Sequence, residues 1–174
     1  MGVISRKLET VKDRLWFSMV ISGLFLLFFV FFYYPRWGTN DDAGIMSFLV
    51  GAKGIRDPHA LYINILLGRL FCALYEAAPD FPWYPLAQYV IIYCSITAVC
   101  HVMIRRLRYV SRLWMAVVFA AAFSFEGYIR IQFTKTAGIA CAAGGILLIY
   151  ALSRKKTAWV YYTAGIILMM IGSM

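Results

Sequence analysis

The sequence predicts an all-α membrane protein whose chain crosses the bilayer about five times. Of its 174 residues 63% are hydrophobic and only 14% are charged, with a mean hydropathy of +0.74, which is far from the composition of a soluble domain. The segment LWFSMVISGLFLLFFVFFYY runs for 20 residues without a charge. At about 1.5 Å per residue it can cross a hydrocarbon core of roughly 30 Å. Further apolar runs alternate with short basic clusters, which is typical of a polytopic helical bundle.

We expect one membrane domain over residues 1–174. The first apolar run is expected to be a retained anchor, because it is too long for a signal peptide and YYPRWG lacks a small-residue cleavage pattern. Pro85 suits the first turn of a later helix, where a missing N–H costs nothing. The final helix ends flush with the carboxy terminus, so we expect a truncated chain. The predicted spans are about residues 16–35, 84–104, 113–129, 136–153 and 157–174, with an outer loop at 36–83.

The distribution of bases predicts the topology. The segment at 58–78 is long enough to span but carries four polar or charged residues: His59, Asn64, Arg69 and Glu76. If it spans, the basic clusters at 105–112 and 154–156 both lie outside. If it stays on the outer face, 11 of the 17 bases face the cytoplasm. The positive-inside rule favours the second arrangement, with five spans and a cytoplasmic amino terminus.

The acids show the opposite bias. Glu9 and Asp13 are predicted to be cytoplasmic. The other six are predicted at the outer face: Asp41, Asp42, Asp57, Glu76, Asp80 and Glu126. Because acids contribute little to topology itself, their concentration suggests that the outer face carries the function.

The long outer loop is expected to hold one or two helices lying along the membrane surface. A short helix capped by Asp41 or Asp42 should end at Gly54. A second helix should start with Asp57 as its cap and Pro58 as its first residue. The first of these helices has an apolar face at helical spacing: Ile45, Phe48, Leu49 and Ala52.

The acid pair in NDDAGIMSFLVGAKG is the first candidate site. Asp41 and Asp42 could simply cap a helix and face water. Alternatively, one of them caps the helix or binds a metal while the other acts as a general base, because neighbouring carboxyl groups can have different pKa values in different surroundings.

A second candidate site is FEGYIRIQFTKTAG, at the outer end of the third span. Glu126 and Arg130 are four residues apart and could form a local ion pair. Arg130 and Lys135, with the hydroxyls of Thr134 and Thr136, could instead bind a phosphate or meet lipid headgroups. Arg69 shares a helix face with Glu76, seven residues on, and this face could point to water or line a cavity.

Other patterns constrain the fold and exclude several classes of function. GIACAAGGILL predicts close helix packing, with Gly138, Ala142 and Gly145 as contact points. The four cysteines follow no metal-ligand spacing, so we expect neither a disulfide nor a zinc site. Soluble-enzyme motifs are absent from the sequence. The aromatic excess near helix ends is typical of interfacial belts, so no nucleic-acid partner is expected.

The chain resembles the amino-terminal part of a bacterial polytopic GT-C-type membrane glycosyltransferase or an uncharacterised relative. Three features carry this resemblance: the acid pair in WGTNDDAGIMSFLVGAKG, the long first outer loop, and the segment FEGYIRIQFTKTAG in the second outer loop. The resemblance covers nearly the whole chain, and the acid motif is its main mark. It implies that Asp41 or Asp42 is a catalytic base or ligates a divalent cation. It also implies that Arg130 and Lys135, and Arg69 as a further candidate, bind a lipid phosphate or substrate, with Glu126 assisting.

The resemblance implies a function at the inner membrane. A polyprenyl-phosphate donor would pass its sugar to an envelope glycan on the outer face, by an inverting transfer in which a carboxylate deprotonates the acceptor hydroxyl. Such enzymes usually have more spans, so missing helices or a protein partner would complete the machinery. The alternative is a non-catalytic membrane subunit, or a component for binding, transport or polymerisation of lipid-linked glycans.

Overall fold

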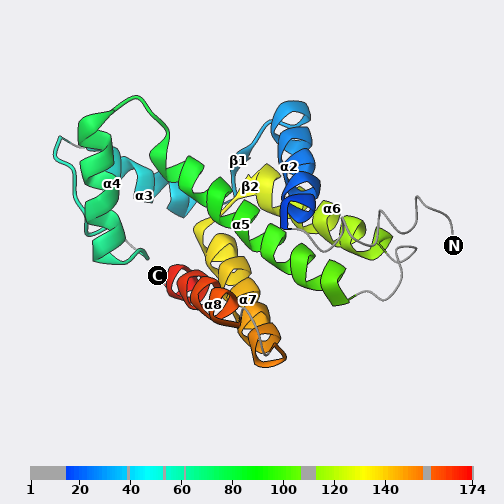
Figure 1. The fold of residues 1–174 in the computed structure, drawn as a ribbon. Helices are drawn as coiled ribbons and strands as arrows, with labels where there is room; N and C mark the ends of the chain where they lie inside the picture. Colours follow the sequence, from blue (N-terminus) through cyan, green and yellow to red (C-terminus); the bar gives the residue numbers. More distant parts are fainter. Residues whose placement is uncertain are drawn as a thin grey trace, which may run out of the picture.

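The computed structural model describes residues 15–38, 40–52, 54–60, 62–106, 113–154 and 158–173. Within these ranges seven helices and one two-residue ladder form the fold (Figure 1), which confirms the all-α class. The elements are α2 (Leu15–Phe32), β1 (Arg36–Trp37), α3 (Asn40–Val50), α4 (Ile65–Ala77), α5 (Trp83–Arg106), α6 (Trp114–Ile129), β2 (Arg130–Ile131), α7 (Phe133–Leu152) and α8 (Ala158–Gly172).

Three of these helices, α2, α5 and α7, are long and apolar enough to cross a membrane. Helices α6 and α8 are also apolar but have 16 and 15 residues, or about 24 and 22 Å at 1.5 Å per residue. The structure therefore supports a membrane protein with at least three candidate spanning helices in its described part.

Helix α5 is the centre of the fold and contacts three separate cores. Near its start it packs against α3 and α4 through a cluster that includes Leu49, Phe71 and Tyr84. Along its length it packs on one side against α2 and α6 and on the other against α7 and α8. Figure 1 shows α3 and α4 at one end of α5, away from α6.

Helix α3 ends earlier than the sequence predicted. Its stop is Gly51, with φ +81°, and not Gly54. The Ala52 N–H donates to the Ser47 carbonyl at 3.0 Å and the Gly51 N–H donates to the Phe48 carbonyl at 3.2 Å. This pair of bonds is a Schellman motif, which needs a left-handed residue and therefore favours glycine.

Helix α4 begins at Ile65, so the prediction of a start at Asp57 and Pro58 is wrong. The Asn64 side chain caps it by accepting from the Leu66 N–H at 2.9 Å. Asp57 instead accepts from the His59 N–H at 2.9 Å, within a local turn. The intervening loop folds back on the helix at Gly68, where a Cβ would lie 2.1 Å from the Pro58 carbonyl oxygen.

Helices α7 and α8 pack closely against each other, and within the chain this contact is made by Gly144 and not by the predicted contact points Gly138 and Gly145. A Cβ on Gly144 would lie 2.7 Å from the Gly165 carbonyl oxygen, so only glycine permits this approach. The predicted contact points Gly138 and Gly145 have no heavy atom within 4 Å of an added Cβ. Gly138 and Ala142 instead line an open groove beside α6.

The segment after α2 and the segment after α6 are joined by the ladder of β1 and β2. The strands are parallel, with Arg36 opposite Arg130 and Trp37 opposite Ile131. The Gly38 N–H extends the contact by donating to the Ile131 carbonyl at 2.7 Å. The ladder therefore brings the chain before Asp41 against the chain that leads into α7.

Candidate functional site

Asp42 is completely buried and is an acceptor for donors on two other helices of the fold. Its Oδ1 accepts from the Tyr84 hydroxyl at 2.9 Å, from Gln88 Nε2 at 3.2 Å and from the backbone N–H of Phe133 at 3.0 Å. The carboxylate thus ties α3 to the start of α5 and to the first residue of α7.

The network continues beyond Asp42. Gln88 Oε1 accepts from the Thr136 hydroxyl at 3.0 Å, and the Tyr84 N–H donates to the Tyr75 hydroxyl at 3.1 Å. Burial raises the pKa of Tyr75, which keeps it a neutral phenol. We call Asp42, Tyr84, Gln88 and Thr136 the Asp42 network.

The network explains why a carboxylate is tolerated in this core. The N-terminus of a helix presents unpaired N–H groups and a partial positive charge, which favour an acid. Asp42 supplies that acid to α7 and also lies in the first turn of its own helix α3. Buried acceptors with several donors hold their elements in one arrangement, so the primary role of Asp42 is positioning.

Asp41 differs from its neighbour, because its side chain is exposed at the start of α3. Of the two acids, Asp41 is the one whose surface is accessible to a ligand from solution. The two residues were equal candidates in the sequence, and the structure separates them by their position on the helix.

Tyr84 and Gln88 were not predicted from the sequence. A signal was present, since YPLAQY places a glutamine inside a predicted span, where an uncharged polar group needs a partner. Thr136, predicted as part of a phosphate cluster, is instead buried in the Asp42 network. Thr134 remains exposed.

Two arginines lie side by side on the ladder. Arg36 and Arg130 are register partners, and both side chains are exposed. They line one side of a pocket of about 400 Å³ together with Tyr33, Phe125, Glu126 and Ile129. We call Arg36 and Arg130 the arginine pair. Two like charges opposite each other on a ladder destabilise it, unless an anion lies between them.

Glu126 pairs with Lys135 and not with Arg130 as the sequence suggested. The Lys135 Nζ lies 2.6 Å from Glu126 Oε1 and 3.4 Å from the Arg130 carbonyl oxygen. Helix α6 ends at Ile129, so Arg130 leaves the helical face that would have brought it over Glu126. One acid, Glu126, and three bases, Arg36, Arg130 and Lys135, therefore gather at the C-terminal end of α6.

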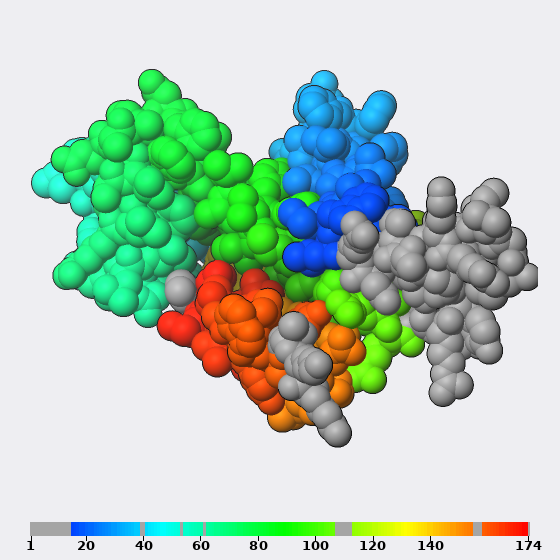
Figure 2. Space-filling view, viewed as in Figure 1, coloured from blue at the N-terminus to red at the C-terminus, as the bar shows by residue number. Residues whose placement is uncertain are grey.

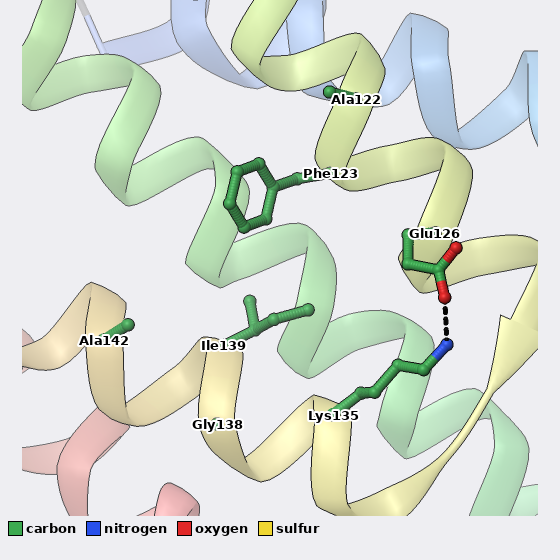
Figure 3. A pocket seen from close by; sticks show the side chains of 7 residues that line it. All are labelled: Ala122, Phe123, Glu126, Lys135, Gly138, Ile139 and Ala142. Atoms are coloured by element: carbon green, nitrogen blue, oxygen red, sulfur yellow. Dashed lines mark hydrogen bonds and ion pairs between the residues drawn. The ribbon is translucent and has the colours of Figure 1, made fainter.

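An apolar groove opens below that ion pair (Figure 3). Its volume is about 520 Å³, and it separates α6 from α7. Glu126 and Lys135 close one end, and the remaining lining is apolar: Ala122, Phe123, Gly138, Ile139 and Ala142. We call this the α6–α7 groove. Its shape and lining suit a hydrocarbon chain beneath a charged headgroup.

A third cavity borders the arginine pair on the other side. Arg36 and Trp37 line it with Tyr89, and its volume is about 620 Å³. Figure 2 shows the surface hollowed between α2, in blue, and the start of α5, in green. The rest of its lining is mostly proline: Pro35, Pro82 and Pro85, with Leu86 and Ile131. We call it the Trp37 cleft.

Arg69 is not brought to these cavities. It is exposed on α4, which packs against α3 and α5 and lies away from α6 in Figure 1. Glu76 is exposed on the same helix. This part of the predicted site is thus separated from Arg130, Lys135 and Glu126.

The described residues do not offer a good cation site at Asp42. No three His, Cys, Asp or Glu side chains gather in the part of the chain that the structure describes. Asp42 Oδ1 faces three hydrogen-bond donors, whose positive ends would repel a metal ion at that oxygen. Asp42 Oδ1 therefore does not fit the predicted role of ligating a divalent cation, and the cation-binding role predicted for Asp41 stays a prediction.

Comparison of the chain with protein-family models, with curated proteins and with solved structures finds no match.

Proposed function

We propose that this protein binds a polyprenyl-phosphate-linked sugar at the outer face of a bacterial inner membrane and acts in sugar transfer to an envelope glycan. The observation that carries the proposal is the pocket lined by the arginine pair, which shares one lining residue with each of two other cavities. Glu126 lines both the arginine pocket and the α6–α7 groove. Arg36 lines both the arginine pocket and the Trp37 cleft.

This order of cavities matches the order of groups in the ligand. The phosphate would lie between Arg36 and Arg130, since guanidinium groups bind phosphate through paired hydrogen bonds. The prenyl chain would enter the apolar α6–α7 groove past Lys135. The sugar would enter the Trp37 cleft, where an aromatic face and nearby polar groups suit a pyranose ring.

The proposed topology has five spans, α2, α5, α6, α7 and α8, with a cytoplasmic amino terminus and with α3 and α4 on the outer surface. The length of α5 supports it. From Gln88 to Arg106 the helix rises about 27 Å at 1.5 Å per residue, close to the hydrocarbon thickness of a bilayer. The positive-inside rule supports the orientation.

In the proposed transfer, Asp41 is the base. Its carboxylate takes the proton of an acceptor hydroxyl, whose oxygen forms a bond to the anomeric carbon from the side opposite the phosphate. The bond from that carbon to the phosphate oxygen breaks, and its electron pair leaves with the polyprenyl phosphate. Arg36 and Arg130 stabilise the phosphate as it leaves. The GT-C resemblance of the acid motif supports this assignment.

A non-catalytic role in binding lipid-linked glycans is the second candidate. The positioning role of Asp42 favours it, because only one acid of the pair is then accessible for chemistry. Both candidates require the phosphate site, and they differ only in whether Asp41 is needed for turnover.

Binding of polyprenyl phosphate to the purified full chain in nanodiscs tests the shared part. The double variant Arg36→Gln/Arg130→Gln should weaken binding at least about tenfold, because each charged hydrogen bond contributes roughly 1.5–3 kcal/mol. Arg69→Gln, which removes an exposed charge from α4, is the matched control. Equal binding by the double variant and the wild type would refute the site.

A transfer assay with polyprenyl-phosphate sugar as donor then separates the two candidates. Asp41→Asn should abolish transfer and leave polyprenyl phosphate binding intact if the protein is an enzyme. Binding without transfer by the wild type, in the presence of the membrane acceptor, supports the non-catalytic role.

A further inference from the structure

Two arginines from different helices converge on one tyrosine at the other end of the bundle. The guanidinium carbon of Arg106, the last residue of α5, lies 5.1 Å from the Tyr150 ring centroid. That of Arg154, just beyond α7, lies 5.6 Å from the same ring. Arg106 also donates to the Ser153 hydroxyl. We call Arg106, Tyr150, Ser153 and Arg154 the Tyr150 cluster.

The platform for these arginines is fixed by the core. Tyr150 is only 3% exposed and packs edge-on against Tyr161 of α8, with ring centroids 4.9 Å apart. The Ser153 hydroxyl is held by a 2.7 Å bond to the Tyr150 carbonyl oxygen. The buried ring therefore contacts both guanidinium groups, and the Ser153 hydroxyl accepts a hydrogen bond from one of them, that of Arg106.

Helix dipoles explain only part of this arrangement. A cation near the C-terminus of a helix is favourable, and each arginine follows or ends a helix. That effect acts along each helix axis and gives no reason for two guanidinium groups to approach the same ring. Each gains a cation–π contact, but their mutual repulsion remains.

The described acids do not neutralise the Tyr150 cluster. All six lie in segments at the Asp42 end of the fold: Asp41, Asp42, Asp57, Glu76, Asp80 and Glu126. Both ion pairs found among the described residues, Asp57 with His59 and Glu126 with Lys135, belong to that end. In the sequence, further bases follow Arg106 and Arg154, at Arg108, Arg112, Lys155 and Lys156, all outside the described residues.

The length of α7 would place the cluster at the depth of a lipid headgroup if the helix spans the membrane. Helix α7 joins the Asp42 network to the Tyr150 cluster, and from Phe133 to Leu152 it rises about 28 Å at 1.5 Å per residue. That is one hydrocarbon thickness, so the two clusters lie at opposite membrane surfaces when α7 spans.

We propose that the Tyr150 cluster binds the phosphate of an anionic phospholipid headgroup at the membrane surface opposite to Asp42. The two guanidinium groups would take up the phosphate oxygens, and the acyl chains would follow the apolar outer faces of α5 and α7. Basic sites between spanning helices recognise anionic headgroups in this way. The site is independent of the proposed polyprenyl phosphate site, which lies at the other surface.

Native mass spectrometry of the purified full chain in detergent tests the site, with phosphatidylglycerol as the probe and phosphatidylcholine as the uncharged reference. The wild type should retain phosphatidylglycerol at least about fivefold better than phosphatidylcholine. Arg106→Gln/Arg154→Gln should lose this preference. Arg69→Gln, on α4 at the other surface, should keep it. Thermal unfolding of each variant, within about 2 °C of the wild type, shows that the fold is intact.

A second arm distinguishes a lipid from a free anion. Glycerol phosphate, which has the headgroup chemistry without acyl chains, is added in excess and should displace little bound phosphatidylglycerol. Complete displacement would overturn the assignment to a lipid. An unchanged preference in the double variant, or no preference in the wild type, would overturn the site itself. Arg106→Lys/Arg154→Lys should restore part of the preference, since charge remains while paired hydrogen bonds are lost.

Discussion

The Asp42 network and the arginine pair lie at the same end of the bundle, yet they satisfy their polar groups in opposite ways. Asp42 is fully buried, and its Oδ1 accepts from three donors of the chain itself. Arg36 and Arg130 are exposed and face each other across a two-residue ladder. A buried polar group must find its hydrogen-bond partner within the fold, whereas an exposed pair of like charges is accessible to a ligand from outside. We infer that the Asp42 network, which ties α3 to the start of α7, holds in place the neighbouring ladder that carries the arginine pair.

The strongest test of this contrast is to remove the buried acceptor. Asp42→Ala leaves three donors without their partner, and each buried unsatisfied group costs about 1–3 kcal/mol. We expect a loss of roughly 3–5 kcal/mol in the free energy of unfolding, measured by thermal and denaturant unfolding in detergent. Asp41→Ala, one residue away and exposed, should change it by less than about 0.5 kcal/mol. Equal effects of the two substitutions would show that the network does not hold α3.

Helix α7 offers a second comparison between a buried and an exposed position, here for two neighbouring glycines. Gly144→Ala places a methyl group 2.7 Å from the Gly165 carbonyl oxygen, and such overpacking costs about 1–3 kcal/mol. Gly145→Ala meets no heavy atom within 4 Å and should be neutral or stabilise the helix by up to about 1 kcal/mol. Unfolding in detergent measures both. Destabilisation by Gly145→Ala would mean that another helix covers this face.

Much of the helical framework could be predicted from the sequence, because apolar length and turn residues are local signals. The ends of α5 and α7 lie within about three residues of the predicted spans. The Schellman stop at Gly51 was missed because the sequence offers two glycines, Gly51 and Gly54, and either of them can end a helix.

The site itself was harder to predict, because its parts meet only through tertiary contacts. Which of two adjacent acids becomes buried depends on how α3 docks on α5, and no local pattern of charges records that. Arg36 lies in the predicted outer loop at 36–83, but it was not predicted as a partner of Arg130, since a two-residue ladder leaves no periodic signal. The placement of Lys135 over Glu126 likewise depends on the turn that ends α6.

A weaker effect is expected at the exposed ion pair between Glu126 and Lys135, which lies next to the arginine pair. Glu126→Gln should change the free energy of unfolding by less than about 1 kcal/mol, as for most exposed ion pairs. It should also strengthen polyprenyl phosphate binding by about two- to fivefold, because Lys135 loses its competing carboxylate. Titration of the lipid into nanodiscs measures this. Weaker binding in the variant would show that Glu126 contacts the ligand directly.

The smallest effect is expected at Asp57, which is the exposed counterpart of Asp42. Asp57 accepts from the His59 backbone N–H at 2.9 Å, and Asp42 accepts from that of Phe133 at 3.0 Å. Of the two, Asp57 lies at the surface. The hydrogen bond from the His59 N–H, with a further contribution from the His59 side chain, lowers the pKa of Asp57 below its ordinary value of 3.8. Since the folded-state pKa is the lower one, the carboxylate stabilises the turn above pH 3.8, and this contribution is lost as the pH falls through the folded-state value.

Hydrogen exchange at the His59 amide can measure this local stabilisation of the turn. The exchange rate in Asp57→Asn, divided by that in the wild type at the same pH, should exceed one at neutral pH and should approach one as the pH falls below 3.8. His59→Ala should retain most of the Asp57 shift, because the backbone bond is its largest cause. Asp80→Asn, a change at another exposed acid, should leave the ratio near one throughout. A ratio that stays constant across the titration would mean that the Asp57 carboxylate contributes nothing to the turn, and that only burial, as at Asp42, makes an aspartate structural in this fold.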